Sequence, residues 1–248
     1  MEINDYLDAT YLKTAQQANI SEQGNENKVI ALVKEAVFNQ YKLVMIRANY
    51  ITLAKKIISE ANSRVLVGTV IGFHEGTSTV NEKLVEATKA IELGADELDF
   101  VINYAAFKKG DFDLIDQEVF QGTALCLKNK KTVKWIIEVA ALRNQEIIVI
   151  SQRIKNVVIK HFGEDNSDKV FVKSSTGFFK TNGNKPNGAT FETMKLIIEN
   201  AKPLKVKAAG GISNTQTAIK MIQLGVDRIG TSSSKEISEN IHNQKSNY

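Results

Sequence analysis

Ala90-Ile-Glu-Leu-Gly-Ala-Asp-Glu-Leu-Asp99 has a near copy much later in the chain, Met221-Ile-Gln-Leu-Gly-Val-Asp-Arg-Ile-Gly230. In each copy a helical pattern of apolar residues ends at a glycine, Gly94 or Gly225, which supplies the left-handed backbone that commonly ends a helix. An aspartate then turns the chain, and a β-branched or apolar strand begins. Two copies of one helix-to-strand joint predict a repeated βα architecture.

The rest of the chain alternates in the same way between short β-branched runs and longer amphipathic stretches. The runs are apolar throughout rather than at alternate positions, which is typical of buried parallel strands. We expect strands at 43–46, 65–71, 98–102, 133–139, 170–173, 206–208 and 228–230, preceded by a short first strand at 6–10. We expect helices at 28–38, 51–60, 80–93, 112–128, 145–161, 190–201 and 215–224. Capping-box patterns start two of them, Thr79-Val-Asn-Glu82 and Ser213-Asn-Thr-Gln216.

These alternations within 248 residues predict an α/β protein, a single (β/α)8 TIM barrel that occupies residues 1–248 as one domain. No linker divides the chain. A doubly wound open sheet is the alternative, but no GxGxxG motif follows an early strand. The loosest segment, residues 178–188, would lie at the catalytic face of a barrel, and residues 239–248 are expected to form a flexible tail.

Composition excludes several classes of function. The net charge of +4 is mild, and only five of the 32 basic residues are arginines, so we expect no nucleic-acid partner. No apolar run approaches the ~18 residues of a membrane span, and the N-terminus is acidic where a signal peptide is basic. We therefore expect a cytoplasmic protein without membrane contact. The single cysteine, Cys126, and three scattered histidines predict no disulfide, no metal site and no cofactor held by one.

Three charged residues stand where buried strands should be apolar. Asp99 lies inside Leu98-Asp-Phe-Val-Ile102, Lys173 ends Val170-Phe-Val-Lys173, and Lys207 follows Val206. A buried isolated charge is costly, so each side chain needs a partner or a cavity. At the ends of barrel strands all three would point into one mouth. The alternative is that each lysine extends its ammonium to solvent and that Asp99 caps a helix.

Together these residues suggest amine catalysis. A lysine in an apolar site, or beside a second ammonium, has a lowered pKa and can attack a carbonyl as a free amine. The resulting Schiff base is an electron sink for carbon–carbon bond cleavage. A nearby carboxylate can carry protons for loss of water and for protonation at carbon.

Glycines follow three of the late strands, in Ser175-Thr-Gly177, Gly210-Gly211 and Gly230-Thr-Ser-Ser233. Glycine lets backbone amides approach a phosphate, and a helix start adds a favourable dipole. TIM barrels commonly bind phosphate in the loops after their last strands. Tight turns alone would also explain each glycine, but three such loops favour a phosphate site.

These motifs resemble the deoxyribose-phosphate aldolases, class I aldolases that need no metal. The resemblance covers most of the chain and rests on seven motifs: Asp8-Ala-Thr-Tyr-Leu-Lys13, Thr69-Val-Ile-Gly-Phe73, Gly94-Ala-Asp-Glu-Leu-Asp-Phe-Val-Ile-Asn103, Ile136-Ile-Glu138, Val172-Lys-Ser-Ser-Thr-Gly-Phe178, Val206-Lys-Ala-Ala-Gly-Gly-Ile212 and Ile229-Gly-Thr-Ser-Ser233. It implies a (β/α)8 barrel that reversibly cleaves 2-deoxy-D-ribose 5-phosphate to D-glyceraldehyde 3-phosphate and acetaldehyde, in deoxynucleoside catabolism. It also implies a phosphosugar as the small-molecule partner and a homodimer.

The resemblance also implies a role for individual residues. It makes Lys173 the Schiff-base lysine, Lys207 a proton donor and acceptor that tunes the pKa of Lys173, and Asp99 the proton relay. The residues that it places around the substrate are Thr176, which helps to hold the relay water, the phosphate-loop residues Gly177, Gly210, Gly211, Ser232 and Ser233, and Asp8, Thr10 and Glu138 as polar residues of the mouth. Another Schiff-base phosphosugar aldolase, or a non-catalytic phosphosugar-binding barrel, remains the alternative.

The sequence departs from the family pattern at several positions. Ser213 stands where many members have an arginine near the phosphate, and we expect Lys180 or Lys185 to supply the missing cation. His74 replaces a proline, for which we expect no catalytic role, although a role in proton transfer is the alternative. Met45, where many members have cysteine, is expected to fill the core. Tyr248 ends the chain, as a tyrosine does in some longer members.

Overall fold

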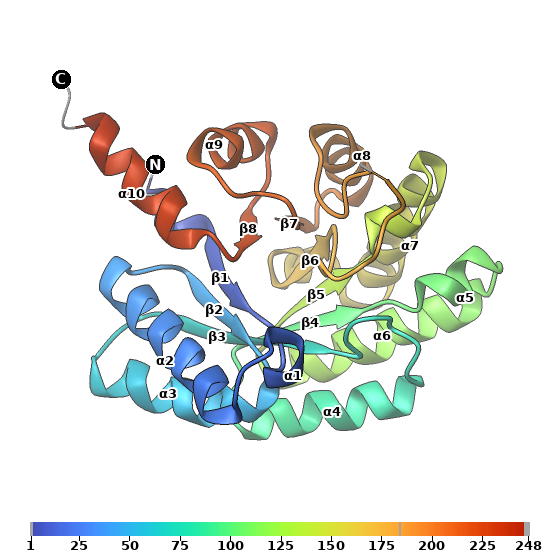
Figure 1. The fold of residues 1–248 in the computed structure, drawn as a ribbon. Helices are drawn as coiled ribbons and strands as arrows, with labels where there is room; N and C mark the ends of the chain where they lie inside the picture. The colour runs from blue at the N-terminus through green and yellow to red at the C-terminus, as the bar shows by residue number, and fades with distance from the viewer. Residues whose placement is uncertain (1, 184, 246–248) are drawn as a thin grey trace.

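The computed structural model describes residues 2–183 and 185–245, and the side chains of 240–245 are not part of that description. Eight parallel strands form a closed barrel in chain order, β1 to β8, with β8 pairing with β1. Helices follow the strands and surround the barrel (Figure 1). The prediction of a (β/α)8 barrel is confirmed, and the open sheet is excluded.

Most predicted strands agree with the structure to within a residue or two. The strands are β1 (Leu7–Tyr11), β2 (Leu43–Ile46), β3 (Leu66–Ile71), β4 (Glu97–Val101), β5 (Thr132–Ile136), β6 (Val170–Lys173), β7 (Lys205–Ala209) and β8 (Arg228–Thr231). Only β5 ends well before its predicted end at residue 139. Glu138 has a left-handed backbone (φ 56°), and a 3-10 turn, η3 (Val139–Ala141), follows it.

The repeated joint takes the same form in both copies. Gly94 and Gly225 adopt positive φ values of 102° and 112°. After each glycine, the aspartate pairs with the preceding strand, because Asp96 Oδ2 accepts from Val67 N and Asp227 Oδ2 accepts from Val206 N, both at 2.9 Å. The aspartate therefore does more than turn the chain: it aligns the new strand beside its neighbour.

The helices are α1 (Ala15–Ala18), α2 (Glu22–Asn39), α3 (Ile51–Glu60), α4 (Val80–Glu92), α5 (Tyr104–Lys108), α6 (Phe112–Lys128), α7 (Asn144–Phe162), α8 (Phe191–Ala201), α9 (Thr215–Leu224) and α10 (Ser234–Lys245). Thr79 and Glu82 form the predicted capping box of α4. The box predicted at Ser213 is wrong by one residue, because Asn214 caps α9 by accepting from Thr217 N. Helices α1, α5 and α10 were not predicted from the sequence.

The tail expected at 239–248 overlaps the last helix. Helix α10 runs to Lys245 and extends away from the barrel in Figure 1, so its described part is helical. Tyr248 lies outside the described residues. None of the described helices is long and apolar enough to span a bilayer.

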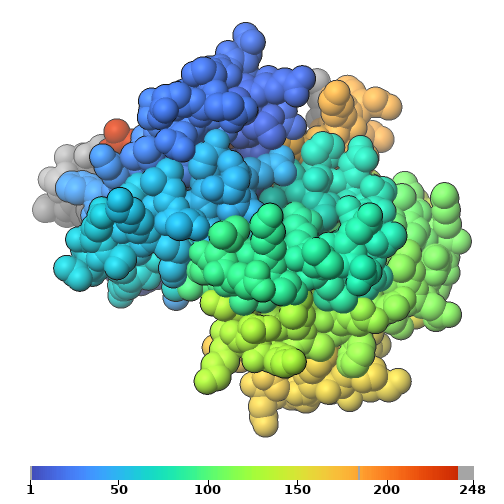
Figure 2. All heavy atoms as spheres, turned by 90° about the horizontal axis from the view of Figure 1, so that it is seen from below, coloured from blue at the N-terminus to red at the C-terminus, as the bar shows by residue number. Residues whose placement is uncertain are grey.

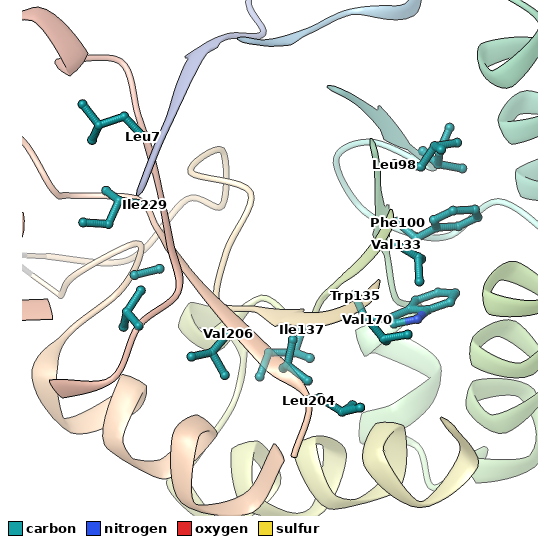
Figure 3. Close-up of a cluster of buried hydrophobic side chains, with 14 of the residues drawn as sticks. Leu7, Leu98, Phe100, Val133, Trp135, Ile137, Val170, Leu204, Val206 and Ile229 are labelled. Atoms are coloured by element: carbon teal, nitrogen blue, oxygen red, sulfur yellow. The ribbon is translucent and has the colours of Figure 1, made fainter. Parts of the chain in front are cut away.

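The main hydrophobic core lies between the barrel strands and the surrounding helices. Figure 3 shows part of it, with Leu98, Phe100, Val133 and Trp135 side by side on β4 and β5. Trp135 is fully buried, its ring centroid lies 5.0 Å from that of Phe100, and its Nε1 donates to Thr123 Oγ1 on α6. The expectation that Trp135 packs a strand is confirmed. The space-filling view from below shows that consecutive parts of the chain pack against one another, from the N-terminal part (blue) through the middle of the chain (green and gold) (Figure 2).

The inside of the barrel has two chemically different halves. Leu43 and Met45 on β2 pack with Val70 on β3 and with Leu12, so this half is apolar and the expectation for Met45 is confirmed. The other half holds seven charged side chains from β1 and β4–β8, which we call the interior charge cluster: Asp8, Glu97, Asp99, Lys134, Lys173, Lys207 and Arg228. The fold therefore confines charge to one side of the interior.

Candidate active site

The three charged residues singled out in the strands meet inside the barrel. Lys173 Nζ and Lys207 Nζ lie 2.9 and 2.8 Å from the same oxygen, Asp99 Oδ2. The two lysines are neighbours because β6 and β7 pair in parallel with Lys173 opposite Lys207. All three side chains are buried, with Lys173 only 3% exposed. Two ammonium groups thus share one carboxylate oxygen, and the alternative of lysines that reach bulk solvent is excluded.

Sequence reasoning missed a third lysine at the same carboxylate. Lys134 on β5 lies opposite Asp99 in the β4–β5 register, and its Nζ is 2.8 Å from Asp99 Oδ1. Lys134 also contacts Glu97. The signal was a charge inside an otherwise apolar strand, the same signal that identified Asp99. It was hidden because Lys134 closely follows two lysines of the preceding turn, the exposed Lys130 and the half-buried Lys131.

Asp8 and Arg228 complete the interior charge cluster below these residues. Asp8 Oδ2 is 2.6 Å from Lys207 Nζ, and Asp8 Oδ1 accepts from Arg228 Nε at 2.8 Å. Arg228 Nη1 in turn lies 3.2 Å from Glu97 Oε1. With every group ionised, four cations face three anions. The cluster carries one excess positive charge, which favours loss of a proton from one of its lysines.

The pKa values within the cluster identify that lysine. Burial lowers the pKa of Lys173 to about 8, Asp99 opposes this shift, and the nearby charges of Lys207 and Lys134 add to it. Lys134 differs: burial also disfavours its charge, but Asp99, Glu97 and Asp8 hold its pKa above the usual value. Lys173 is therefore poised to become a free amine, while Lys134 remains a fixed cation.

Asp99 and Asp8, two carboxylates of the cluster, stay ionised. Burial by itself raises the pKa of Asp99, but Lys134, Lys173 and Lys207 together hold it well below its usual value. Burial acts on Asp8 in the same direction, and there Arg228, Lys207 and Lys134 lower the pKa to about 2. Asp99 is therefore a proton acceptor at neutral pH, in direct contact with three lysines.

A cavity of about 450 Å³ opens above Lys173 at the carboxyl ends of the strands. This mouth pocket is lined by residues 10–13, 176–178, 209–213 and 230–233, together with Lys173 and Asn187. The predicted substrate residues Thr176, Gly177, Gly210, Gly211, Ser232 and Ser233 all belong to it, as does Thr10. Gly177, Gly210 and Gly211 have φ values of 79–85°, so each turn requires the freedom of glycine.

The arrangement combines an amine that can lose its proton, a carboxylate bonded to it, and a glycine-lined pocket above. Such a set can form a Schiff base with a carbonyl compound and move protons around it. The family model described as "DeoC/LacD family aldolase" matches residues 8–233. The chain belongs to this family of aldolases.

Full-length relatives agree with this assignment. A deoxyribose-phosphate aldolase of Thermococcus gammatolerans is 36% identical over 244 residues, covering 98% of both chains. Another from Finegoldia magna is 36% identical over 241 residues, covering 96% of this chain and all of that one. Among solved structures, "QR15, an Aldolase" superposes with a TM-score of 0.81 at 31% identity, over 99% of this chain and 98% of that chain.

A tetrameric deoxyribose phosphate aldolase from Aeropyrum pernix also superposes on this aldolase. Its TM-score is 0.78 at 25% identity, and the match covers 98% of this chain and 92% of that chain. The tetramer is a property of that protein. The homodimer expected for this chain stays a prediction.

Two polar residues expected in the mouth of this aldolase lie beneath it instead. Asp8 is fully buried in the charge cluster, and Glu138 is buried beside Thr176. Glu138 Oε2 accepts from both the hydroxyl and the backbone N of Thr176. The Thr176 hydroxyl oxygen also accepts from Phe178 N at 3.0 Å. Glu138 thus fixes the loop that follows Lys173, and the Thr176 proton is engaged by Glu138.

Three further residues singled out in the sequence do not line the described mouth pocket. His74 stacks on Phe178, with ring centroids 5.7 Å apart, and touches the pocket only through that phenylalanine. Lys180 and Lys185, expected to provide a cation, are exposed residues of the 178–188 loop. The described lining includes a different lysine, Lys13.

Proposed function

We propose that this aldolase cleaves 2-deoxy-D-ribose 5-phosphate reversibly to D-glyceraldehyde 3-phosphate and acetaldehyde through an imine on Lys173. The observation that carries the proposal is the pair of contacts from Lys173 and Lys207 to one oxygen of Asp99, within a buried site where the pKa of Lys173 is lowered to about 8. The names of the full-length relatives support the choice of substrate.

The reaction begins when the neutral amine of Lys173 adds to the C1 aldehyde of the open-chain sugar. The carbinolamine loses water to give an iminium ion, with Asp99 and Lys207 carrying the protons. Removal of the proton from the C3 hydroxyl breaks the C2–C3 bond, and the bonding electrons pass into the iminium as an enamine. Glyceraldehyde 3-phosphate leaves, C2 is protonated, and water releases acetaldehyde and the free amine.

The buried charges account for the direction of each proton transfer. Asp99 is ionised and contacts Lys173 Nζ, so it accepts a proton as the amine adds to the carbonyl. Lys207 contacts the same oxygen and lies next to Lys173 in the sheet register, so it can return a proton to the intermediate. Lys134 holds the other oxygen of Asp99 and fixes the orientation of the carboxylate.

Reductive trapping tests the mechanism. Borohydride added with 2-deoxyribose 5-phosphate, or with acetaldehyde alone, should leave a stable adduct that peptide mass mapping places on Lys173. Lys173→Ala should remove both the adduct and the activity. A wild-type enzyme that turns over without an adduct, or activity that survives in Lys173→Ala, would rule out the imine.

A panel of sugar phosphates tests the substrate. If another phosphosugar is cleaved faster than 2-deoxyribose 5-phosphate while the Lys173 adduct still forms, the chain is a different Schiff-base aldolase. A barrel that binds sugar phosphates without turnover would give neither products nor adduct.

We further infer a cytoplasmic catabolic role, which agrees with a single cysteine, Cys126, that is buried and unpaired.

A further inference from the structure

The charge of the mouth pocket is the starting point. Among the described residues that line it, Lys13 and Lys173 carry the only charged side chains, and none is a carboxylate. Lys173 points down to Asp99 in the charge cluster. Among the described residues that line the pocket, Lys13 is thus the only remaining cation that could bind an anionic group of a ligand.

The backbone around Lys13 is held firmly. The carbonyl of Lys13 accepts from Asn25 Nδ2 at 3.3 Å, and the carbonyl of Leu12 accepts from Arg47 Nε at 2.9 Å. Asn25 is buried, its Oδ1 accepts from the Tyr11 hydroxyl at 2.7 Å, and its Nδ2 also donates to the Tyr50 hydroxyl at 3.1 Å. The main chain at Lys13 is therefore fixed from both sides.

The ammonium of Lys13 is not engaged in the same way. The side chain is exposed, and no described carboxylate lies within 4.0 Å of its Nζ. By contrast, exposed lysines such as Lys56 and Lys195 pair with glutamates one helical turn away. A fixed backbone with an unpaired ammonium at a pocket edge suits a lysine that binds a ligand.

The sheet register places Lys13 beside the last loop of the barrel. Strand β1 pairs with β8 so that Ala9 lies opposite Thr231. The chain leaves β1 toward Lys13 and leaves β8 toward Ser232 and Ser233, and all three residues line the mouth pocket. Helix α10 begins at the next residue, Ser234. This corner joins a cation, two serines and the start of a helix, which together favour an anion.

We propose that Lys13 is the specificity-determining residue of this aldolase that binds the phosphate of the substrate. The proposal rests on the proposed function, because it takes the phosphate to be the C5 group of a sugar whose C1 is bound by Lys173. Lys13 replaces Lys180 and Lys185 in this role, since neither of those residues is part of the described lining.

The test is Lys13→Met, which removes the charge and keeps most of the chain length. We expect the kcat/KM for 2-deoxyribose 5-phosphate to fall about 10- to 100-fold, mainly through KM, as the loss of one charge-assisted hydrogen bond predicts. The kcat/KM for unphosphorylated 2-deoxyribose should not change. Lys13→Arg should retain most of the preference for the phosphorylated sugar. Lys180→Met and Lys185→Met are matched controls and should behave as the wild type.

Two results would overturn the proposal. One is an equal effect of Lys13→Met on both sugars, or no effect on either; the other is a selective loss in Lys180→Met or Lys185→Met. Trapping of acetaldehyde on Lys173 needs no phosphate, so it tests the proposed function separately and should be normal in Lys13→Met. If the wild type fails with 2-deoxyribose 5-phosphate, binding of inorganic phosphate by calorimetry still decides: it should weaken in Lys13→Met, and unchanged binding would reject the assignment.

Discussion

Because Gly230 has no side chain, the side chain of Lys207 can occupy the space beside it. A Cβ atom at Gly230 would lie 2.9 Å from Lys207 Cε, closer than real side chains approach. Gly230 lies in the β8 strand that follows the repeated joint, opposite Ala209 of β7, and the side chain of Lys207, two residues earlier on β7, extends toward it. The glycine is therefore required by the position of a catalytic candidate and not by a turn.

Gly230→Ala should displace the Lys207 ammonium from Asp99 without unfolding the barrel, because the nearest atom belongs to a flexible chain. We expect kcat to fall at least tenfold while the melting temperature changes by only a few degrees. Steady-state kinetics and thermal denaturation on the same preparation check this. Full activity in Gly230→Ala would mean that the placement of Lys207 does not matter.

Lys207→Leu should move the pH profile of this aldolase to higher pH. With a pKa of about 8, roughly a tenth of Lys173 is free amine at pH 7, and this fraction rises with pH. The charge of Lys207 contributes to the lowered pKa of Lys173, and its loss also leaves Asp99 more strongly paired with Lys173. Both changes favour the ammonium form, so the acidic limb of kcat/KM should shift upward. An unmoved limb would remove Lys207 from this role.

Lys134→Met should disturb the site although Lys134 does not line the described mouth pocket. The change leaves Asp99 Oδ1 without a cation and leaves Arg228 as the remaining cation at Glu97, and breaking a buried pair typically costs about 3–5 kcal/mol. We expect a clear fall in melting temperature, together with an upward shift of the acidic limb because the repulsion on Lys173 is reduced. Lys56→Met, an exposed lysine on α3, is the control and should change neither quantity.

Gly188→Ala should separate two loops of the mouth pocket. A Cβ atom at Gly188 would lie 2.5 Å from the backbone of Gly210, where Ala189 N bonds to the carbonyls of Ala209 and Gly210. We expect KM for the phosphorylated sugar to rise several-fold. Gly183→Ala, in the same loop, meets nothing within 4 Å, although its φ is positive. Gly188 has no positive φ, so Gly188→Ala adds a clash and no such backbone strain. An equal effect in both variants would therefore contradict the role of the loop contact.

The fold could be predicted closely because its signals are local. Strands 43–46 and 170–173 agree with the prediction to the residue, since the first is an apolar run between polar neighbours and the second is an apolar run that ends at a lysine. Helices α3, α6 and α9 have the expected bounds. Strand β5 was too long in the prediction because nothing local indicates that Glu138 adopts a left-handed backbone.

The candidate site was predictable only in part. Asp99, Lys173 and Lys207 could be found because each interrupts or ends an apolar strand. The contact of the lysines with the Asp99 carboxylate could not be predicted, since it depends on the register that sets Lys173 opposite Lys207 and Asp99 opposite Lys134. Arg228 and Asp8 are 220 residues apart in sequence, and only closure of the barrel brings them together. Lys13 belongs to the family motif at residues 8–13, but its place at the pocket edge depends also on the pairing of β1 with β8.

The division of the barrel interior has a consequence for thermal tolerance. Each ion of the cluster has lost hydration worth several kcal/mol, and salt bridges seldom return all of it. The charged residues proposed for catalysis are thus the part of the interior that contributes least to the stability of the fold. Refilling that side with close-packed aliphatic chains, as on the β2–β3 side, should give a barrel that melts at a higher temperature and performs no chemistry. The same interior residues therefore provide the activity and lower the melting temperature of this protein.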